Sequence, residues 1–377
     1  MTARAENEST VTPVIARALR LCTMEPTATT RDDFSRALSR IDDWSAAWGV
    51  ARQHRIAGYV SRAAAAHKVE LPAAVQQATR HISLVQTSES LRMESHLRRV
   101  AATFRKAVVP VIVLKGPALA RTLYPAIGLR PYGDLDLTVH DDDEQAAVDA
   151  LLADGFTEIV DVDERSRREH RSSSGHEGHY HRRFESADGS VLVELHLDPL
   201  QLGLKPTCEA GRWERAVPLP GTPGALMLGP EDQVVQLSVH AHKHGFERLI
   251  WLKDLDLLVR QSASTLDWSL VRRVARSEGV SGSVWYALWL THKLLGTPLP
   301  SAELAAMRPS AAVRVLYGWV WPPRTIAGLQ ARMRRRAVQF RAADSLRGML
   351  PATVLMGRRR ARARAFVDVA FGGAATR

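Results

Sequence analysis

The feature that most constrains the fold is an abrupt change of hydrophobic pattern at Val108. Residues 108–114 form a continuous apolar run rich in β-branched side chains, which predicts a short buried strand. Lys115-Gly116-Pro117 follows this run, and Pro117 suits the first position of a helix. Strands and helices are then expected in alternation, over 108–114, 118–124, 134–139 and 143–153. This order indicates a core in which helices pack on a sheet.

The sequence on both sides of this core shows the spacing of apolar side chains that is typical of helices. A hairpin is expected from 180 to 197, with a two-residue turn at Asp188-Gly189, because both positions of such a turn tolerate positive φ. We therefore expect an α+β protein. Its expected parts are an N-terminal helical region (1–107), an α/β core (108–200), a C-terminal helical region (201–323) and a basic tail (324–377).

Two carboxylates stand on the second expected strand, in Asp134-Leu135-Asp136. Residues i and i+2 of a strand point to the same face, so the two acids lie side by side while Leu135 packs on the opposite face. Two adjacent carboxylates repel each other unless a cation lies between them, and oxygen ligands of this kind suit Mg²⁺ or Mn²⁺. A pair of acids alone is common on protein surfaces, so the prediction depends on what accompanies it.

A third acid follows in the strand expected before residue 197. Glu194, His196 and Asp198 alternate with apolar residues and share one face of that strand. If the strand lies beside Asp134, Glu194 completes a cluster of three carboxylates. Such a cluster can hold two metal ions roughly 4 Å apart, as in phosphoryl and nucleotidyl transfer. His196 faces the same way, either as an acid or base or, as we favour, as a support that orients the cluster.

Groups that could bind phosphate precede the acids. Lys115 and Gly116 stand where a strand ends and a helix begins, a place where backbone N–H groups favour an anion. Gly116 would allow a phosphate to approach closely, and Lys115 would add a positive charge. Arg130 could neutralise further phosphate charge or position the carboxylates.

This set of motifs resembles the DNA polymerase β-like nucleotidyltransferase superfamily and, within it, a bacterial family of uncharacterised nucleotidyltransferases. The resemblance covers roughly residues 50 to 290. The matching blocks are Leu114-Lys115-Gly116, Tyr124-Pro125, Arg130, Asp134-Leu135-Asp136-Leu137-Thr138-Val139, Val193-Glu194-Leu195-His196, and His240 with Trp251-Leu252-Lys253-Asp254-Leu255.

The resemblance implies a small mixed sheet as the catalytic core, flanked by helices, and a nucleotidyl-transfer reaction. Asp134, Asp136 and Glu194 are the expected metal ligands and catalytic residues. Lys115, Gly116, Arg130, His196, His240 and Asp254 are the expected nucleotide-binding residues. The expected cofactor is Mg²⁺ as two ions, with Mn²⁺ as an alternative, and the expected donor is ATP. One departure is that Pro117 removes a backbone donor from a turn that is usually Gly-Ser or Gly-Gly in the superfamily.

Other histidines carry weaker signals. In a helix His240 and His244 would share a face that excludes His242, but no Glu follows them in the order of a metalloprotease motif. His240 and Asp254 are expected either to line the cleft opposite the carboxylates or to be buried polar groups of two packed helices. The polar segment with His170, His176, His179 and His181 is either a loop over the active site or a plain solvated loop.

The net charge of +11 lies wholly in the tail, where residues 324–377 carry thirteen arginines against two acids. The tail could bind RNA, an anionic membrane or an acidic partner, or be a solvated arginine-rich face. Cys22 and Cys208 are far apart, so no disulfide framework or thiolate zinc site is expected. The sequence has no signal-peptide pattern and no apolar run of about 18 residues, so a cytoplasmic enzyme or binding protein is expected.

The expected function is transfer of a nucleoside monophosphate from an NTP to a hydroxyl or similar acceptor, with release of pyrophosphate. The acceptor is expected to be a small molecule, a peptide or a protein. Two alternatives remain open. The tail suggests an enzyme that modifies RNA or tRNA in the manner of toxin-like nucleotidyltransferases, and a third hypothesis is a catalytically silent nucleotide-binding scaffold, against which the intact set of three acids argues.

Overall fold

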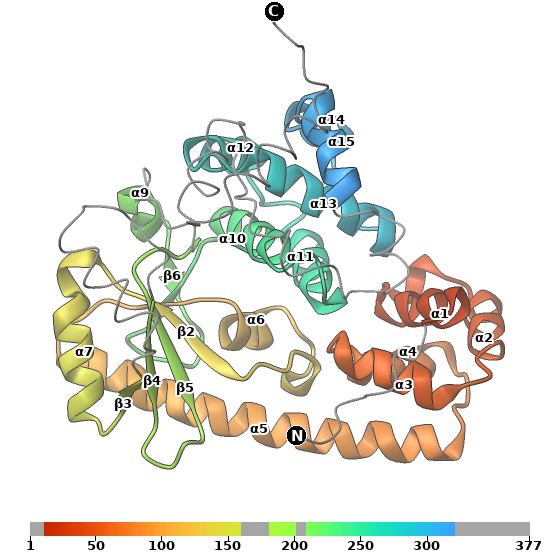
Figure 1. Cartoon of the computed structure of the whole chain (residues 1–377), viewed down its shortest axis with the longest axis horizontal. Coiled ribbons are helices and arrows are strands. Elements are labelled where there is room, and N and C mark those ends of the chain that lie inside the picture. Colours follow the sequence, from red (N-terminus) through yellow and green to blue (C-terminus); the bar gives the residue numbers. More distant parts are fainter. Residues whose placement is uncertain (1–10, 160–180, 201–208, 321–377) are drawn as a thin grey trace, which may run out of the picture.

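The computed structural model describes residues 11–159, 181–200 and 209–320. Helices surround one mixed sheet, so the α+β expectation is confirmed (Figure 1). Within the described ranges, no helix is both long enough and apolar enough to cross a membrane. The basic tail (324–377) and three histidines of the polar loop, His170, His176 and His179, lie outside the described residues.

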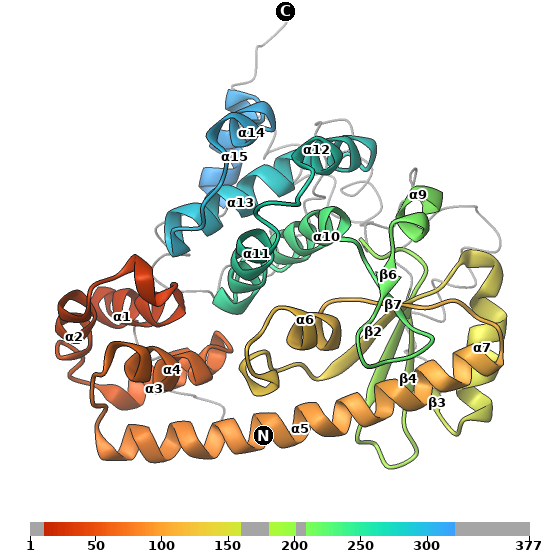
Figure 2. The same ribbon diagram turned by 180° about the vertical axis from the view of Figure 1, so that it is seen from behind.

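The N-terminal helices form where the apolar spacing predicts them. Threonine or aspartate side chains cap three of them, since Thr12, Thr30 and Asp43 each accept a backbone N–H of the first turn. The helices are α1 (Pro13–Thr23), the 3-10 turn η1 (Pro26–Ala28), α2 (Arg31–Leu38), α3 (Trp44–Gln53), α4 (Ala57–His67) and α5 (Ala73–Lys106). Helix α5 runs beneath the whole molecule, from the N-terminal helices to the sheet (Figure 2).

The sheet has seven strands in the order β3-β4-β5-β2-β1-β7-β6. Its centre is the parallel pair β2 and β5, and β1 is antiparallel to β2 on the other side. The strands are β1 (Ile112–Val113), β2 (Asp134–Thr138), β3 (Thr157–Ile159), β4 (His181–Glu185), β5 (Leu192–His196), β6 (Val217–Pro218) and β7 (Leu226–Met227). The connecting helices are α6 (Gly116–Thr122), η2 (Ile127–Leu129), η3 (Asp141–Asp143), α7 (Glu144–Ala153) and α9 (Glu209–Glu214).

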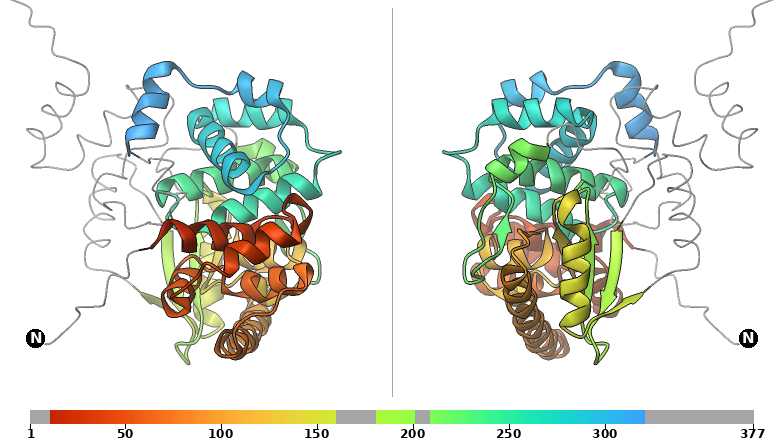
Figure 3. Two further views of the ribbon diagram at one scale, coloured as in Figure 1. Left: turned by 90° about the vertical axis from the view of Figure 1, so that its right-hand side faces the viewer. Right: turned by 90° about the vertical axis from the view of Figure 1, so that its left-hand side faces the viewer.

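The two faces of the sheet differ in character. Apolar side chains of β2 and β5, including Leu135 and Val193, share a core with Leu97 of α5 and Val148 of α7. These two helices cover that face, with α5 seen almost end-on in the right-hand view of Figure 3. The polar residues that alternate with them project from the opposite face, as the strand periodicity predicts.

The first strand is shorter than expected. Of the run 108–114, only Ile112 and Val113 form β1. Val108 instead ends α5 with a positive φ of 58°, and Pro110 has no N–H to donate to a sheet ladder. The run therefore predicts burial correctly for Val109 and for residues 111–114, but Val108 is exposed at the end of α5.

The β4–β5 hairpin is confirmed, but its turn is longer than the two residues expected. Ser186 donates its backbone N–H to the Val191 carbonyl, so four residues (187–190) form the loop. Gly189 has a positive φ of 66°, whereas Asp188 does not. The Asp188 carboxylate accepts hydrogen bonds from the hydroxyls of Ser186 and Ser190, and this local bonding replaces the two-residue turn.

Strands β6 and β7 lie in a segment rich in proline and glycine, residues 217–230, a composition that is typical of loops. Each has two residues, and β7 pairs in parallel with β1. Strands this short are specified by their partner strand rather than by their own pattern.

The C-terminal helices pack against the N-terminal ones as well as over the sheet (Figure 1). One hydrophobic core contains Leu19 of α1, Val60 of α4, Leu255 of α11 and Leu290 of α13. The two helical regions, far apart in sequence, therefore share a core. The helices are α10 (Pro230–Lys243), α11 (Leu249–Gln261), α12 (Trp268–Ser277), α13 (Ser281–Leu295), α14 (Ser301–Ala306) and α15 (Ala311–Val320).

Candidate active site

The sheet register brings the acids of two distant segments together. In the parallel pair of β2 and β5, Asp136 lies directly opposite Glu194, and Thr138 lies opposite His196. Asp134 projects from the same face two residues before Asp136. The expected neighbourhood of the three acids is therefore a consequence of strand pairing at the centre of the sheet.

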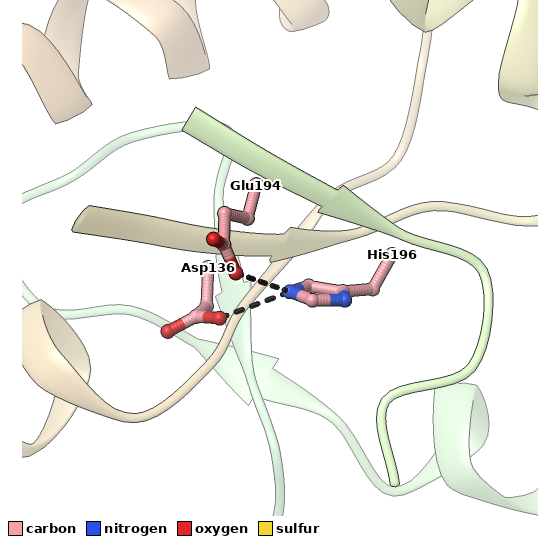
Figure 4. Close-up of side chains that lie close together, drawn as sticks. All are labelled: Asp136, Glu194 and His196. Carbon is pink, nitrogen blue, oxygen red and sulfur yellow. Dashed lines mark hydrogen bonds and ion pairs between the residues drawn. The ribbon is translucent and has the colours of Figure 1, made fainter. Parts of the chain in front are cut away.

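The side chains of Asp136, Glu194 and His196 converge, as Figure 4 shows. The His196 Nε2 atom lies 2.9 Å from Asp136 Oδ1 and 3.7 Å from Glu194 Oε2. One ligand atom from each of the three residues lies within 4.8 Å of the others, which suits a bound metal ion. Among the described residues, Asp136, Glu194 and His196 form the group whose ligand atoms are this close together. Asp134 does not belong to this group of three.

Lys115 reaches the same cluster from the end of β1. Because β1 is antiparallel to β2, the Leu114 N–H donates to the Asp136 carbonyl at 2.8 Å, and the next residue emerges beside the Asp136 side chain. The Lys115 Nζ atom lies 3.0 Å from Asp136 Oδ1, and only 8% of its side chain is exposed. Its backbone has a φ of 46°, a conformation that L-residues adopt at a cost.

The acids have divergent electrostatic environments. Burial, followed by the charges of Asp136 and Asp134, raises the pKa of Glu194 to about 7. Burial and the Asp136 charge also raise the pKa of Asp134. Burial alone would raise the pKa of Asp136, but Lys115 and His196 hold it below its usual range. Asp136 is therefore the ionised centre of the cluster, and Glu194 is the group that exchanges a proton near neutrality.

A neighbouring side chain explains why glycine stands at position 116. Gly116 is buried, and a Cβ there would lie 2.9 Å from the Cβ of Tyr132. The close neighbour that requires glycine is thus Tyr132. Phosphate approach at Gly116 stays a prediction.

Arg130 and Asp254, both expected near the nucleotide, bind each other. The Arg130 guanidinium donates from Nε and from a terminal nitrogen to the Asp254 carboxylate at 2.7 and 2.8 Å. The Tyr124 hydroxyl donates to the same carboxylate at 2.5 Å. The side chains of Arg130 and Asp254 are 4% and 0% exposed. This buried triad joins the loops before β2 to helix α11, so these motif residues have an internal role, and their contact with nucleotide stays a prediction.

His240 and His244 share a face of α10, as the helical spacing predicts. Their rings lie 4.7 Å apart, and Trp251 of α11 packs against both, at 5.1 and 5.2 Å. His242 points elsewhere, with its Nδ1 atom 2.6 Å from the Ser283 hydroxyl oxygen. Burial, followed by the charges of Lys115 and His244, keeps the pKa of His240 well below its usual value, so this imidazole is neutral.

Sequence reasoning missed three basic residues near the acids. Burial and the charge of Lys115 lower the pKa of Lys243 to about 7, against the opposing effect of nearby acids that include Asp136 and Glu194. Arg183 of β4 lies directly opposite Glu194 in the antiparallel pair. Arg55 donates to the Pro131 carbonyl at 3.2 Å, and its charge is felt by Asp134. Lys243 stands between the histidines that the sequence did single out, so its position was the available signal.

A profile of a family described as "Uncharacterised nucleotidyltransferase" matches residues 41–296, more than half of the chain. This match confirms the resemblance drawn from the motifs. No curated protein matches the sequence.

Proposed function

Because the chain belongs to the uncharacterised nucleotidyltransferase family, we propose that it moves a nucleoside monophosphate from an NTP, with ATP as the donor, to a hydroxyl or similar acceptor on a small molecule, peptide or protein. The observation that carries the proposal is the in-register pair of Asp136 and Glu194, with Asp134 on the same face and Lys115 beside them. This arrangement supplies negative oxygen ligands and a cation at one place.

The residues present fit a divalent cation. The donor set offers three carboxylates, two of which lie with an imidazole inside 4.8 Å. When bound, such ions would neutralise phosphate charge and favour ionisation of the acceptor hydroxyl. Asp134, Asp136 and Glu194 would hold them.

The chain's own groups have separate tasks in this reaction. The acceptor oxygen forms a bond to the α-phosphorus, the bond from that phosphorus to the bridging oxygen breaks, and pyrophosphate leaves. Glu194, directly opposite Asp136 at the centre of the cluster, would accept the hydroxyl proton. Lys115 would stabilise charge on the departing phosphates. The triad of Arg130, Asp254 and Tyr124 would hold the loop before β2 against the helices, so that Asp134 and Asp136 stay in position.

The test is transfer of label from α-³²P-labelled NTPs to candidate acceptors in the presence of Mg²⁺ or Mn²⁺, with pyrophosphate release measured in parallel. Asp134→Asn and Asp136→Asn should each abolish transfer, whereas Asp142→Asn, at an exposed position before α7, should not. Calorimetry with a non-hydrolysable ATP analogue and metal adds a binding readout. Unchanged metal–nucleotide affinity in Asp134→Asn would overturn the site assignment, and RNA as the labelled acceptor would favour the RNA-directed alternative.

A further inference from the structure

The compact donor set at the centre of the sheet contains a nitrogen. The three residues whose ligand atoms lie within 4.8 Å of one another are two carboxylates and one imidazole, not three carboxylates. His196 is fixed in this place by its strand, because it is two residues beyond Glu194 on β5 and opposite Thr138 of β2. Its side chain is 1% exposed, so its Nε2 atom has little freedom to turn away from the two acids.

Ligand type decides which ions such a site prefers. Mg²⁺ favours oxygen ligands and keeps several waters, whereas imidazole nitrogen suits first-row transition metals. Mn²⁺ accepts both carboxylate oxygen and imidazole nitrogen, and it also binds nucleotide phosphates. A set of two carboxylates and one imidazole therefore discriminates against Mg²⁺ in a way that three carboxylates do not.

We propose that His196 is a direct metal ligand through Nε2, and that Asp136, Glu194 and His196 together form a site for a first-row transition ion of the Mn²⁺ type. The inference refines the metal site on which the proposed function rests. The imidazole proton resides on Nδ1 when Nε2 binds the ion. The competing role for His196 is that of a positioning residue whose Nε2–H donates to Asp136 at the observed 2.9 Å.

Two features of the cluster favour the ligand role. The Nε2 atom faces both acids, at 2.9 and 3.7 Å, whereas a support for Asp136 needs only one. Lys115 already donates a charged hydrogen bond to the same Asp136 oxygen, at 3.0 Å. Asp136 therefore has a cationic partner besides His196, so a metal-bound imidazole would still leave this carboxylate with the Lys115 contact.

The experiment uses the full-length protein, stripped of metal with a chelator and titrated with Mn²⁺. Continuous-wave EPR gives the Mn²⁺ affinity, and electron spin-echo modulation reports whether a ¹⁴N nucleus is bonded to the ion. The variant is His196→Gln, whose amide can still donate a hydrogen bond to Asp136 but supplies no imidazole nitrogen. His81→Gln, at an exposed position on α5, is the matched control. Circular dichroism checks that both variants fold.

Wild-type protein and His81→Gln should show ¹⁴N modulation typical of a bound imidazole. His196→Gln should lose it, with Mn²⁺ affinity falling on the order of tenfold or more and Mg²⁺ affinity changing less than about twofold. Bound Mn²⁺ without ¹⁴N modulation in the wild type, or equal losses for both ions in the variant, would overturn the proposal. Failure of Mn²⁺ to bind at all would overturn it too, and nucleotidyl transfer that persists with Mg²⁺ would then show that the proposed function survives.

Discussion

The buried triad of Tyr124, Arg130 and Asp254 offers the sharpest test of how the site is held. Replacing Asp254 with Asn removes the negative charge that pairs with the Arg130 guanidinium, whose side chain is only 4% exposed. Breaking a buried ion pair in this way costs about 3–5 kcal/mol. The Asp134 charge also favours the charged form of Arg130, although its effect is the weakest of those that raise the Arg130 pKa. Because this charge remains in the variant, we expect the cost of Asp254→Asn to lie near the lower end of that range.

The assay is unfolding followed by circular dichroism, with heat and with urea. For a protein of 300–400 residues the unfolding entropy is about 0.6–0.8 kcal/mol/K, so a loss of about 3 kcal/mol lowers the Tm by roughly 4–5 °C. Tyr124→Phe removes one hydrogen bond to the carboxylate and should cost less, about 1.5–3 kcal/mol. Arg36→Gln is the control, because Arg36 and Asp33 form an exposed pair that should contribute less than about 1 kcal/mol.

Two results would refute the reasoning. One is that Asp254→Asn costs no more than Arg36→Gln, which would mean that the buried pair carries little net stability. The other is that Asp254→Asn keeps its Tm but loses affinity for a non-hydrolysable ATP analogue. That outcome would assign Asp254 to nucleotide binding, as the sequence resemblance implies.

Three further predictions concern the backbone and the site. Val108 is 84% exposed and occupies the left-handed position after α5, so Val108→Gly should raise the unfolding free energy by about 1 kcal/mol. Gly155→Val, at the matching position after α7, should lower the unfolding free energy. A change of the same sign in both variants would contradict this reasoning. Gly116→Ala should cost about 1–3 kcal/mol in a melt because the new Cβ meets Tyr132, and a neutral result would show that Tyr132 can yield. In chelator-treated protein, folding raises the pKa of Glu194 from 4.5 to about 7, so the folded state binds this proton more tightly than the unfolded state does. The unfolding free energy should therefore fall by on the order of 2 kcal/mol as the pH rises from 4.5 to 7. Glu194→Gln should flatten this pH dependence in urea titrations.

The acids could be found from the sequence because strand periodicity is local. Alternation in Asp134-Leu135-Asp136 and around Glu194 places polar and apolar side chains on opposite faces, and the structure has this arrangement. The roles of Arg130 and Asp254 could not be found in this way. They are 124 residues apart, and only the packing of α11 against the loops before β2 makes them partners.

Local conflicts account for the boundaries that were missed. The apolar run at 108–114 is compatible both with a strand and with the end of α5, and Val108 adopts a left-handed conformation at the helix end instead of joining the strand. The β4–β5 turn is longer than expected because the Asp188 side chain bonds to two neighbouring serines. Such competitions differ by small energies that a pattern of residue types does not resolve.

The sequence by itself determined that this chain builds a sheet core with helices on both sides, that its acids share one face, and that it resembles a nucleotidyltransferase. Periodicity and residue chemistry act over a few neighbours, so they are readable without coordinates. Only the tertiary structure decided that Glu194 pairs in register with Asp136 and that His196 joins them as a nitrogen donor. It also decided that Lys243 of α10 lies close enough to the acids for their charges to act on its pKa. Register, and contacts between segments more than a hundred residues apart, depend on the packing of the whole chain, which no local pattern encodes.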